Sequence, residues 1–587
     1  MTRPNPRFPT LSVVRDGALT AKSTPDCDAA PTVTGGEALV RTLAARGVDT
    51  YFGVPGGSVA PVIDAIVHGA SVRLVEPRHE THAAYAAAGF HRATGRIPAV
   101  VVAGFAGVTN VVTGLVSALV DRAPMIVIVG DASESTGRSA RAEGSDGVGL
   151  ERMLEGVSRG VFRVMSAASI ATVAMAAVER ATDPQNRGPC VIIVPVEVGS
   201  ARCRLPATRA ARRTGAVSEF PPSRDVLNTL AGRLRTARRP LVFVGAGCRD
   251  ASSAVLQLIE SMQCPFVTTP RAKGILPETH PLSLRNAGIS SSMWARSYCA
   301  AGPDFTIALG TELDEASIAG TPPIGAGGTL VRVTSDSGAA RNHESALAIS
   351  CGVAAFARTF RESVRAYGGS PVGHALAIAT RSAPAFHFPH FDNDARDPIA
   401  PHRVIADLED AVPADATFVT DIGEHLLFAL HYLTSGGLRR FVIDAGLGSS
   451  ASGIAASIGT ALGDPSRTVV CICGGSGMQT AGTDILVAIE QRLPIVFAVF
   501  DDDRSTRRLE SSRAAPRIDF VLWAQSLGIR GARIDRPGDI HRDRIRELTA
   551  GGMPALLDIR QDSSVRVGAD EPLEALRAMS MGGDGHR

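Results

Sequence analysis

The stretch of residues 467–504 constrains the fold most, because it contains two buried-strand patterns separated by a glycine loop and a helix. Residues 469–473 form a continuous apolar run that stops at a Gly-Gly-Ser-Gly sequence, and residues 495–500 form a second run that ends in three aspartates. Continuous apolar runs of this length are typical of parallel strands that are buried on both faces. Ligands of parallel sheets bind beyond the carboxyl ends of the strands, where glycine loops expose backbone N–H groups and acids can hold a cation. We therefore expect a parallel sheet with a ligand site at this edge.

Residues 98–131 repeat this plan of strand, glycine loop, helix and strand. The repetition predicts two domains of one architecture. A single copy would be weak evidence, because every doubly wound protein repeats such a unit. A capping box at Thr34 and Glu37 predicts that the ordered part of the chain begins with a helix.

The length of 587 residues is enough for about three domains of ordinary size. Hydrophobic residues make up 45% of the chain and charged residues 20%, and the net charge of +2 lacks the excess of positive charge that is typical of nucleic-acid-binding proteins. We therefore expect a small-molecule substrate and no nucleic-acid partner. No apolar run reaches the ~18 residues needed to span a bilayer, so we expect no membrane partner and a cytoplasmic location. The nine scattered cysteines are expected to be reduced core residues.

Several motifs occur in an order and spacing that resemble thiamine-diphosphate-dependent enzymes, and most closely the large catalytic subunit of the acetolactate synthase group. They are Tyr51-Phe52-Gly53-Val54-Pro55-Gly56-Gly57, Arg78-His79-Glu80, Gly107-Val108-Thr109-Asn110, and two further stretches at residues 273–282 and 444–448. The resemblance covers nearly all of the chain from about residue 34 to residue 570. It is specific to the fold, because many motifs keep their order.

The resemblance implies an α/β protein of three doubly wound parallel-sheet domains. The expected boundaries are 1–31 for a flexible N-terminal extension, 32–200 for a pyrimidine-binding-type domain, 201–224 for a linker, 225–366 for a central nucleotide-binding-like domain, 367–401 for a second linker, 402–570 for a diphosphate-binding-type domain and 571–587 for a tail.

Glu80 is the candidate with the clearest chemical role. In the family, a carboxylate hydrogen-bonds the aminopyrimidine ring of thiamine diphosphate so that its imino form can take the proton from C2, and Glu80 matches that position. Considered alone, a glutamate at a strand-to-helix junction is more simply understood as a first-turn residue favoured by the helix dipole. His79 and Phe105 are the other catalytic candidates, and Phe105 lies where the family's Gly-Pro-Gly loop has backbone near the substrate.

The resemblance also implies cofactor-binding positions in the glycine-rich turns of the first domain and at the strand ends of the third. These candidates are Gly56, Gly57, Asn110, Gly423, Glu424, His425, Gly448, Ser450, Gly474, Gly475, Ser476 and Gly477. Glu424 replaces a neutral glutamine beside the diphosphate, where like charges repel. His425, which matches the family, would offset that charge only partly. Ser450 lies in the segment where acetolactate synthases use a methionine to bend the cofactor.

The metal site expected from the family is also altered. Family members hold a divalent cation with an aspartate of a Gly-Asp-Gly loop and an asparagine at the end of the next strand, and the matching positions here are Gly475 and Asp502. A Mg²⁺ site formed by Asp502 with help from Asp501 is one interpretation, and loss of the metal is the other. The predicted cofactors are thiamine diphosphate and Mg²⁺, and both depend on what replaces the carboxylate missing at Gly475.

FAD is not expected as a cofactor. The central domain contains Gly245-Ala246-Gly247-Cys248, which is half of a dinucleotide fingerprint. However, the Arg- and Asp-rich signature of flavin-binding acetolactate synthases is replaced by Thr311-Glu312-Leu313-Asp314-Glu315-Ala316. In the family, the cofactor lies between the first domain of one chain and the third domain of another, so the resemblance implies a homodimer or homotetramer with the active site between chains.

The leading hypothesis is an acetolactate synthase-like carboligase or lyase that acts on a 2-oxo acid or a related carbonyl substrate through thiamine diphosphate, in a specialised pathway. One alternative is a homologue that has lost the cofactor and uses Glu80, Glu424 and His425 for acid–base chemistry in the same cleft. The other is a non-catalytic protein that binds a partner or a metabolite. The cofactor content discriminates between the first two hypotheses, and replacement of Glu80 by glutamine tests the third.

Overall fold

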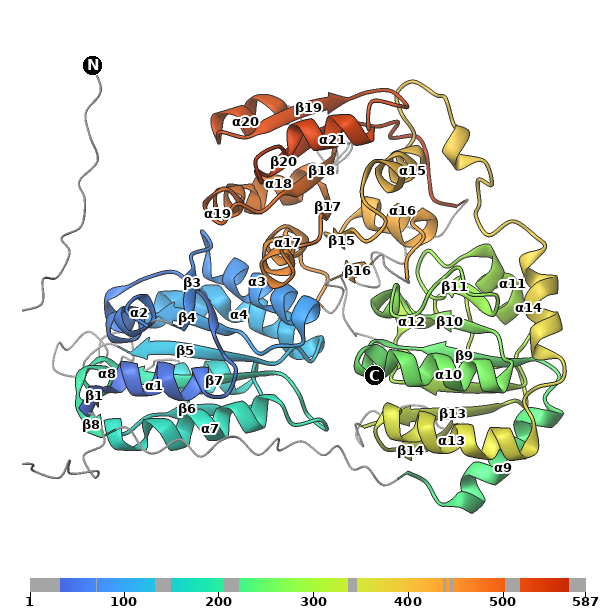
Figure 1. Ribbon diagram of the computed structural model, residues 1–587, viewed down its shortest axis with the longest axis horizontal. Helices are drawn as coiled ribbons and strands as arrows, with labels where there is room; N and C mark the ends of the chain where they lie inside the picture. Colours follow the sequence, from blue (N-terminus) through green and yellow to red (C-terminus); the bar gives the residue numbers. More distant parts are fainter. Residues whose placement is uncertain are drawn as a thin grey trace, which may run out of the picture.

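The computed structural model of the chain describes residues 32–69, 71–131, 149–204, 221–335, 346–436, 440–443, 447–501 and 518–568. It contains three six-stranded parallel sheets flanked by helices (Figure 1). The predicted α/β class with three doubly wound parallel sheets is therefore confirmed. The predicted N-terminal extension, the predicted C-terminal tail and motif residues 444–446 lie outside the described residues.

The N-terminal sheet has the strand order β3-β2-β4-β5-β7-β6, and its neighbouring strands are parallel. The elements of this unit are β1 (Thr32–Thr34), α1 (Gly35–Ala44), β2 (Thr50–Gly53), η1 (Gly57–Val59), α2 (Ala60–Val67), β3 (Arg73–Val75), α3 (Glu80–Thr94), β4 (Ala99–Ala103), α4 (Gly104–Val120), β5 (Met125–Asp131), α6 (Leu150–Glu155), β6 (Val161–Arg163), η3 (Ala167–Ser169), α7 (Ile170–Ala181), β7 (Pro189–Pro195), α8 (Val196–Ser200) and β8 (Arg202–Arg204). The predicted capping box starts α1, because the side chains of Thr34 and Glu37 each accept a hydrogen bond from the other's backbone N–H.

The central sheet has the strand order β11-β10-β9-β12-β13-β14, again with parallel neighbours. The elements of this unit are α9 (Arg224–Thr236), β9 (Pro240–Val244), η4 (Ala246–Ala251), α10 (Ser252–Met262), β10 (Phe266–Thr268), η5 (Pro270–Ala272), β11 (Ser283–Asn286), α11 (Met293–Ala300), β12 (Phe305–Leu309), α12 (Glu315–Ile318), β13 (Thr329–Thr334), β14 (Ala346–Ser350) and α13 (Val353–Tyr367). The helix α14 (Gly373–Arg381) and the 3-10 helix η7 (Phe391–Asn393) follow it. This unit has hydrophobic cores of its own.

A buried ion network joins the central unit to the C-terminal unit. Lys273 Nζ lies 2.6 Å from Glu278 Oε1, and Arg285 Nη2 lies 3.3 Å from Glu278 Oε2. The backbone N–H of Ser435 also donates a hydrogen bond to Glu278 Oε2, at 2.8 Å. Burial lowers the pKa of Lys273 to about 8. One carboxylate therefore compensates two buried cations at this junction.

The C-terminal sheet has the strand order β16-β15-β17-β18-β20-β19, with parallel neighbours. Its elements are α15 (Pro401–Ala411), β15 (Thr417–Thr420), α16 (Glu424–Tyr432), β16 (Arg440–Ile443), α17 (Ser452–Gly463), β17 (Val469–Gly474), α18 (Gly475–Ala481), η8 (Gly482–Asp484), α19 (Ile485–Glu490), β18 (Ile495–Asp501), α20 (Phe520–Ser526), β19 (Arg530–Ile534), α21 (Arg542–Leu548) and β20 (Ala555–Arg560). The two strands predicted at residues 469–473 and 495–500 are β17 and β18, and they are neighbours in the sheet.

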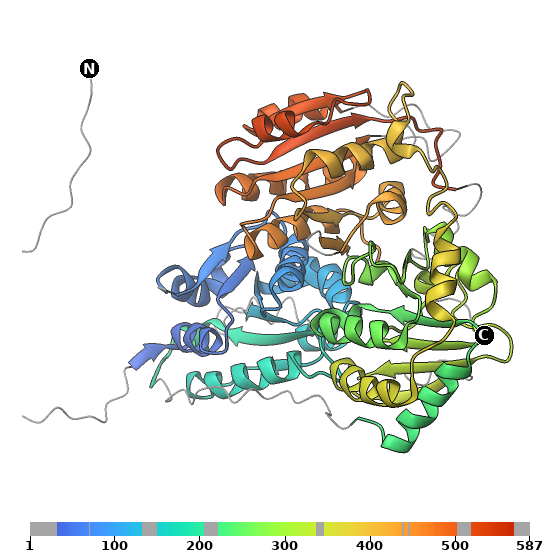
Figure 2. The same cartoon turned by 45° about the vertical axis from the view of Figure 1, so that its right-hand side comes forward.

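The N-terminal and C-terminal units pack on each other through α3 and α17, which lie side by side (Figure 1, Figure 2). A Cβ at Gly459 would lie 1.8 Å from the carbonyl oxygen of Ala86, and a Cβ at Gly89 would lie 2.2 Å from that of Ala456. Glycine at these two positions lets the helix backbones touch. One continuous hydrophobic core runs from the first sheet through both helices into the third sheet.

The cysteines of the described residues are free thiols, and all of them except Cys203 are buried. Burial raises the pKa of Cys190 and of Cys248 to about 12, so these thiols stay protonated and unreactive. The prediction of reduced core cysteines is therefore confirmed for the described cysteines other than Cys203, which is half-buried. Among the described helices, none is both long and apolar enough to cross a membrane.

Candidate active site

Glu80 is the first residue of α3, and its carboxylate contacts the predicted motif of residues 107–110. The side chain of the preceding His79 caps the helix, because Nδ1 accepts a hydrogen bond from the N–H of Thr81 at 3.2 Å. Asn110 Nδ2 donates a hydrogen bond to Glu80 Oε2 at 3.0 Å. A Cβ at Gly107 would lie 3.3 Å from Glu80 Oε1, so a larger residue there would crowd the carboxylate. The two motifs that contain Glu80 and Asn110 therefore meet at one partly exposed acid.

Phe105 and the glycine turn after β2 lie at the carboxyl end of β4. Phe105 is in the first turn of α4, where it is half-buried and packs against the shared core. A Cβ at Gly56 would lie 2.4 Å from the Cβ of Ala103, the last residue of β4. No described atom lies within 4 Å of a Cβ built at Gly57. Close packing against Ala103 thus requires a glycine at position 56, whereas the backbone of Gly57 is free of such contacts with the described atoms and open to a ligand.

The buried carboxylate of Asp421 organises the cofactor loops predicted in the C-terminal unit. Asp421 follows β15 and is fully buried. Its Oδ2 accepts a hydrogen bond from the N–H of Ala451 at 2.9 Å, and its Oδ1 accepts one from the N–H of Gly453 at 3.1 Å. A Cβ at Gly477 would lie only 2.2 Å from Asp421 Oδ2. Asp421 therefore ties the start of α17 to the loop after β15, and α18 can approach it only with glycine at position 477.

The charge of Glu424 is compensated by an arginine rather than by the neighbouring histidine. His425 is buried, its Nε2 lies 3.1 Å from the carbonyl oxygen of Asp421, and burial lowers its pKa to about 4. The ring is therefore neutral at pH 7, which corrects the expectation that His425 offsets part of the charge of Glu424. Arg566 Nη1 lies 3.2 Å from Glu424 Oε1 instead. Gly423 allows the ring to fold back, because a Cβ there would lie 2.4 Å from His425 Cε1.

A pocket of about 370 Å³ lies between the start of α3 and the loops of the C-terminal unit within the same chain. Its lining includes His79 from the N-terminal side, and Ser450 and Thr480 from the C-terminal side. Ser450 is exposed and lies two residues after Gly448, whose φ of +70° favours glycine. The structure thus brings His79 and Ser450 to one pocket, whose lining does not include Glu80.

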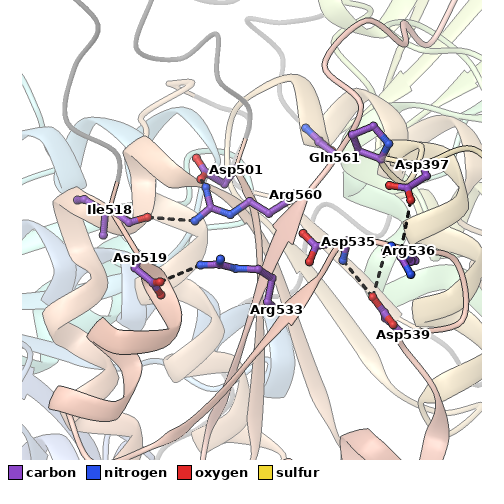
Figure 3. A pocket seen from close by; sticks show the side chains of 11 residues that line it. Asp397, Asp501, Ile518, Asp519, Arg533, Asp535, Arg536, Asp539, Arg560 and Gln561 are labelled. Carbon is purple, nitrogen blue, oxygen red and sulfur yellow. Dashed lines mark hydrogen bonds and ion pairs between the residues drawn. The ribbon is translucent and has the colours of Figure 1, made fainter.

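Gly474, Gly475, Ser476 and Gly477 form the end of β17 and the start of α18, at the edge of the sheet where β18 also ends. Ser476 is exposed, whereas Gly475 is buried against Asp501, because a Cβ at Gly475 would lie 3.2 Å from Asp501 Oδ1. Asp501 Oδ2 forms an ion pair with Arg560 (Figure 3). Asp502, the predicted principal metal ligand, lies outside the described residues.

Mg²⁺ does not fit the described part of this edge. The cation requires several oxygen ligands in near-octahedral geometry. Gly475 supplies no side-chain oxygen, and Asp501 already pairs with Arg560. Within the described ranges, no cluster of three or more His, Cys, Asp or Glu side chains could hold a metal ion.

A larger cavity of about 930 Å³ lies beside Asp501 at the ends of β18, β19 and β20 (Figure 3). Its lining is rich in charge and includes Asp519, Arg533, Asp535 and Arg560. Among the predicted site residues that the structure describes, only Asp501 lines this cavity. The carboxyl edge of the third sheet is therefore open but carries both signs of charge.

In the central unit, the glycine pair of the dinucleotide fingerprint packs against the protein's own backbone. A Cβ at Gly245 would lie 2.2 Å from the carbonyl oxygen of Gly310, and one at Gly247 would lie 3.0 Å from that atom. In the segment that replaces the flavin signature, Glu312 Oε1 lies 3.0 Å from Arg122 Nη2 of the N-terminal unit. This segment therefore contributes to a contact between domains.

Two arginines of the site were not found by sequence reasoning. Arg560 ends the last strand in the chain order, and Arg566 lies in the segment that follows it. The alternation of Asp558 and Arg560 at a strand end was the available signal, since residues two apart in a strand share a face. Nothing in the local sequence indicates which acid each arginine meets.

Comparison with protein families and curated proteins gives one consistent result. Residues 33–150 match the N-terminal TPP binding domain of thiamine pyrophosphate enzymes, residues 227–360 match the central domain, and residues 421–559 match the C-terminal TPP binding domain. The chain is 29% identical over 554 residues to "Putative acetolactate synthase large subunit IlvB2" of Mycobacterium tuberculosis, covering 91% of this chain and 98% of that protein. It is 25% identical over 546 residues to "Acetolactate synthase isozyme 1 large subunit" of Escherichia coli, covering 91% and 95%.

Proposed function

Because the chain belongs to the thiamine pyrophosphate enzyme family, we propose that it is an acetolactate synthase-like enzyme. It would form or cleave a carbon–carbon bond next to the carbonyl group of a 2-oxo acid or a related substrate, as a transferase or a lyase. The observation that carries the proposal is the Glu80 carboxylate, which Asn110 holds at the start of α3 beside Gly107. Family-model matches to both TPP binding domains support thiamine diphosphate as the cofactor.

Glu80 would be the proton-handling group of the site. Asn110 donates to Oε2, which leaves Oε1 as the oxygen that holds and exchanges a proton with a bound ring. When bound, thiamine diphosphate supplies the carbon nucleophile for carbonyl substrates. Gly57, whose backbone is open, and Ser476, whose side chain is exposed, are positions that would contact it. Phe105 would shape the substrate side of the pocket.

We propose that a second copy of the chain completes the site, in a homodimer or homotetramer. In a single chain Glu80 is partly exposed and Asn110 is exposed. General acid–base chemistry of this kind is favoured by exclusion of water. A chain that sediments as a monomer while active would contradict this part of the proposal.

Substitution of Glu80 by glutamine tests the function directly. The variant keeps the size of the side chain but cannot exchange a proton, so we expect turnover of pyruvate or other 2-oxo acids to fall by about 10²–10⁴-fold. Glu76→Gln is the matched control, because Glu76 is an exposed acid on the same segment and should keep full activity. Full activity of the Glu80→Gln variant would exclude the proposed role and favour a non-catalytic protein.

The substrate is proposed to belong to a specialised pathway, because Glu424 and Ser450 differ from the acetolactate synthase pattern. Formation of acetolactate from pyruvate at a housekeeping rate would contradict this. A reaction without the cofactor is the second candidate function, and the observation that favours it is the absence of a carboxylate at Gly475. That candidate predicts turnover that survives removal of thiamine diphosphate.

A further inference from the structure

Asp501 and Arg560 form an ion pair (Figure 3). The pair lies beside Gly475, one of the two positions at which the resemblance implies a metal ligand, and the other position, Asp502, lies outside the described residues. The two residues are register partners at the ends of the adjacent parallel strands β18 and β20. Register partners project from the same face of a sheet, so the guanidinium and the carboxylate meet. Both side chains are largely buried, with exposed fractions of 13% for Asp501 and 12% for Arg560.

Gly475 faces the same spot as the first residue of α18, directly after the neighbouring strand β17. A Cβ built at Gly475 would lie 3.2 Å from Asp501 Oδ1, so a carboxylate at position 475 would stand beside Asp501. Two adjacent carboxylates would create the negative charge that a divalent cation needs. With glycine at 475, Asp501 lacks that second carboxylate beside it, and among the described residues it pairs with the Arg560 guanidinium instead.

Arg560 is fixed in this position by further contacts. Its Nη2 donates hydrogen bonds to Asp558 Oδ2 at 2.8 Å and to the carbonyl oxygen of Ile518 at 3.2 Å. Asp558 is fully buried, so the contact is shielded from solvent. The Nε–H of Arg560 is buried and has no acceptor among the described residues. One donor is therefore left for an acceptor that this part of the chain does not supply.

We propose that Arg560 takes the place of the divalent cation, so that this protein binds thiamine diphosphate without a metal ion. The inference rests on the proposed function for the identity of the ligand. An arginine suits the role because its charge is permanent and its donors match phosphate oxygens. Neutralising Asp501 also removes the repulsion that an unpaired carboxylate would exert on a diphosphate.

Calorimetric titration of the full-length protein with thiamine diphosphate, in EDTA and in Mg²⁺, tests the inference. We expect the two dissociation constants to agree within about twofold, because no metal takes part. We also expect no protein-bound Mn²⁺ signal by electron paramagnetic resonance when Mn²⁺ is added with the cofactor. Binding that requires Mg²⁺, or one bound Mn²⁺ per chain, would overturn the inference and leave the proposed function standing.

Variants at the ion pair give the second test. Arg560→Met should weaken binding in EDTA by at least about tenfold, because it removes charge-assisted hydrogen bonds. Arg536→Met is the matched control, since Arg536 lines the same cavity but pairs with the exposed Asp397 instead, and should leave the affinity unchanged. The double variant Arg560→Met with Gly475→Asp should bind the cofactor in a Mg²⁺-dependent manner, because it restores two adjacent carboxylates.

The outcomes separate the two proposals. Equal affinities for wild type and the Arg560→Met variant would overturn the role of Arg560. Absence of thiamine diphosphate binding both with and without Mg²⁺ would instead overturn the proposed function. If the Arg560→Met variant fails to fold, as judged by circular dichroism, the comparison of EDTA with Mg²⁺ on the wild-type protein still decides the question.

Discussion

Replacement of Gly459 by alanine should loosen the contact between the N-terminal and C-terminal units. The added Cβ would lie 1.8 Å from the carbonyl oxygen of Ala86 and 2.9 Å from the backbone nitrogen of Phe90. Real Cβ contacts essentially never come closer than 3.0 Å. Both atoms belong to the backbone of α3, so no side chain can rotate away. The two helices must therefore separate by more than 1 Å.

Two opposing terms set the size of the effect. Overpacking of a well-packed core costs about 1–3 kcal/mol, and a backbone contact within the shared core belongs at the upper end of that range. Alanine in a helix interior is favoured over glycine by about 1 kcal/mol. We expect a net loss of about 2 kcal/mol in the free energy of unfolding, which corresponds to a decrease of about 4–8 °C in the melting temperature of a unit of this size.

Differential scanning calorimetry checks the prediction, with Gly232→Ala as the control. Gly232 lies within α9, and no described atom is within 4 Å of a Cβ built there. The same substitution should therefore stabilise the central unit by about 1 kcal/mol, because only the helix-propensity term remains. The two substitutions are chemically identical, so their opposite signs isolate the steric contact. A Gly459→Ala protein that melts at or above the wild-type temperature would refute the reasoning.

Three further perturbations have defined outcomes. The pKa of His425 lies near 4 in the folded chain and near 6.5 in an unfolded one, so the stability that its neutral form contributes is complete above pH 6.5 and is lost as the pH falls towards 4. In urea unfolding, His425→Gln should therefore reduce the slope of this decline by up to about 1.4 kcal/mol per pH unit. Equal slopes of unfolding free energy against pH for the two proteins would contradict the prediction. Glu424→Gln should tighten and Arg566→Gln should weaken thiamine diphosphate binding in calorimetric titrations, because they remove opposite charges; shifts of the same sign would exclude a charge effect. Glu278→Gln should lower the free energy of unfolding in urea by about 3–5 kcal/mol, because it leaves two buried cations without their carboxylate. The loss should exceed that of Lys273→Met, and a larger loss for Lys273→Met would contradict this reasoning.

The parts of the fold that sequence reasoning predicted are those set by local patterns. The strand predicted at residues 469–473 is β17 with one added residue, and the capping box at Thr34 starts α1 as expected. In both cases, the signal lies within a few neighbouring residues: an apolar run that stops at glycine, and a hydroxyl three residues before a carboxylate. The meeting of Glu80 with Asn110 depended on the family resemblance, because no local pattern brings these two helices together.

The rest depends on contacts between residues that are distant in the chain. Arg560 meets Asp501 only because β20 inserts beside β18 in the sheet, and strand order cannot be read from either strand alone. The neutral state of His425 likewise results from burial, to which packing against Phe500 of the distant strand β18 contributes. The close approach of α17 to α3 is marked in the sequence only by glycines. Glycines also occur at turns and helix ends, so they do not identify a helix contact by themselves.

The shared core between the first and third units has a consequence for recombination. Each of the three modules of the chain matches a family model of its own, so exchange of modules with relatives is an obvious route to new substrate preferences. The central module has its own cores and could be replaced separately, with its junctions adjusted. The outer two modules bury side chains and helix backbone against each other, so a chimaera should inherit both from one parent. Chimaeras with crossovers on either side of the central module are therefore the ones expected to fold.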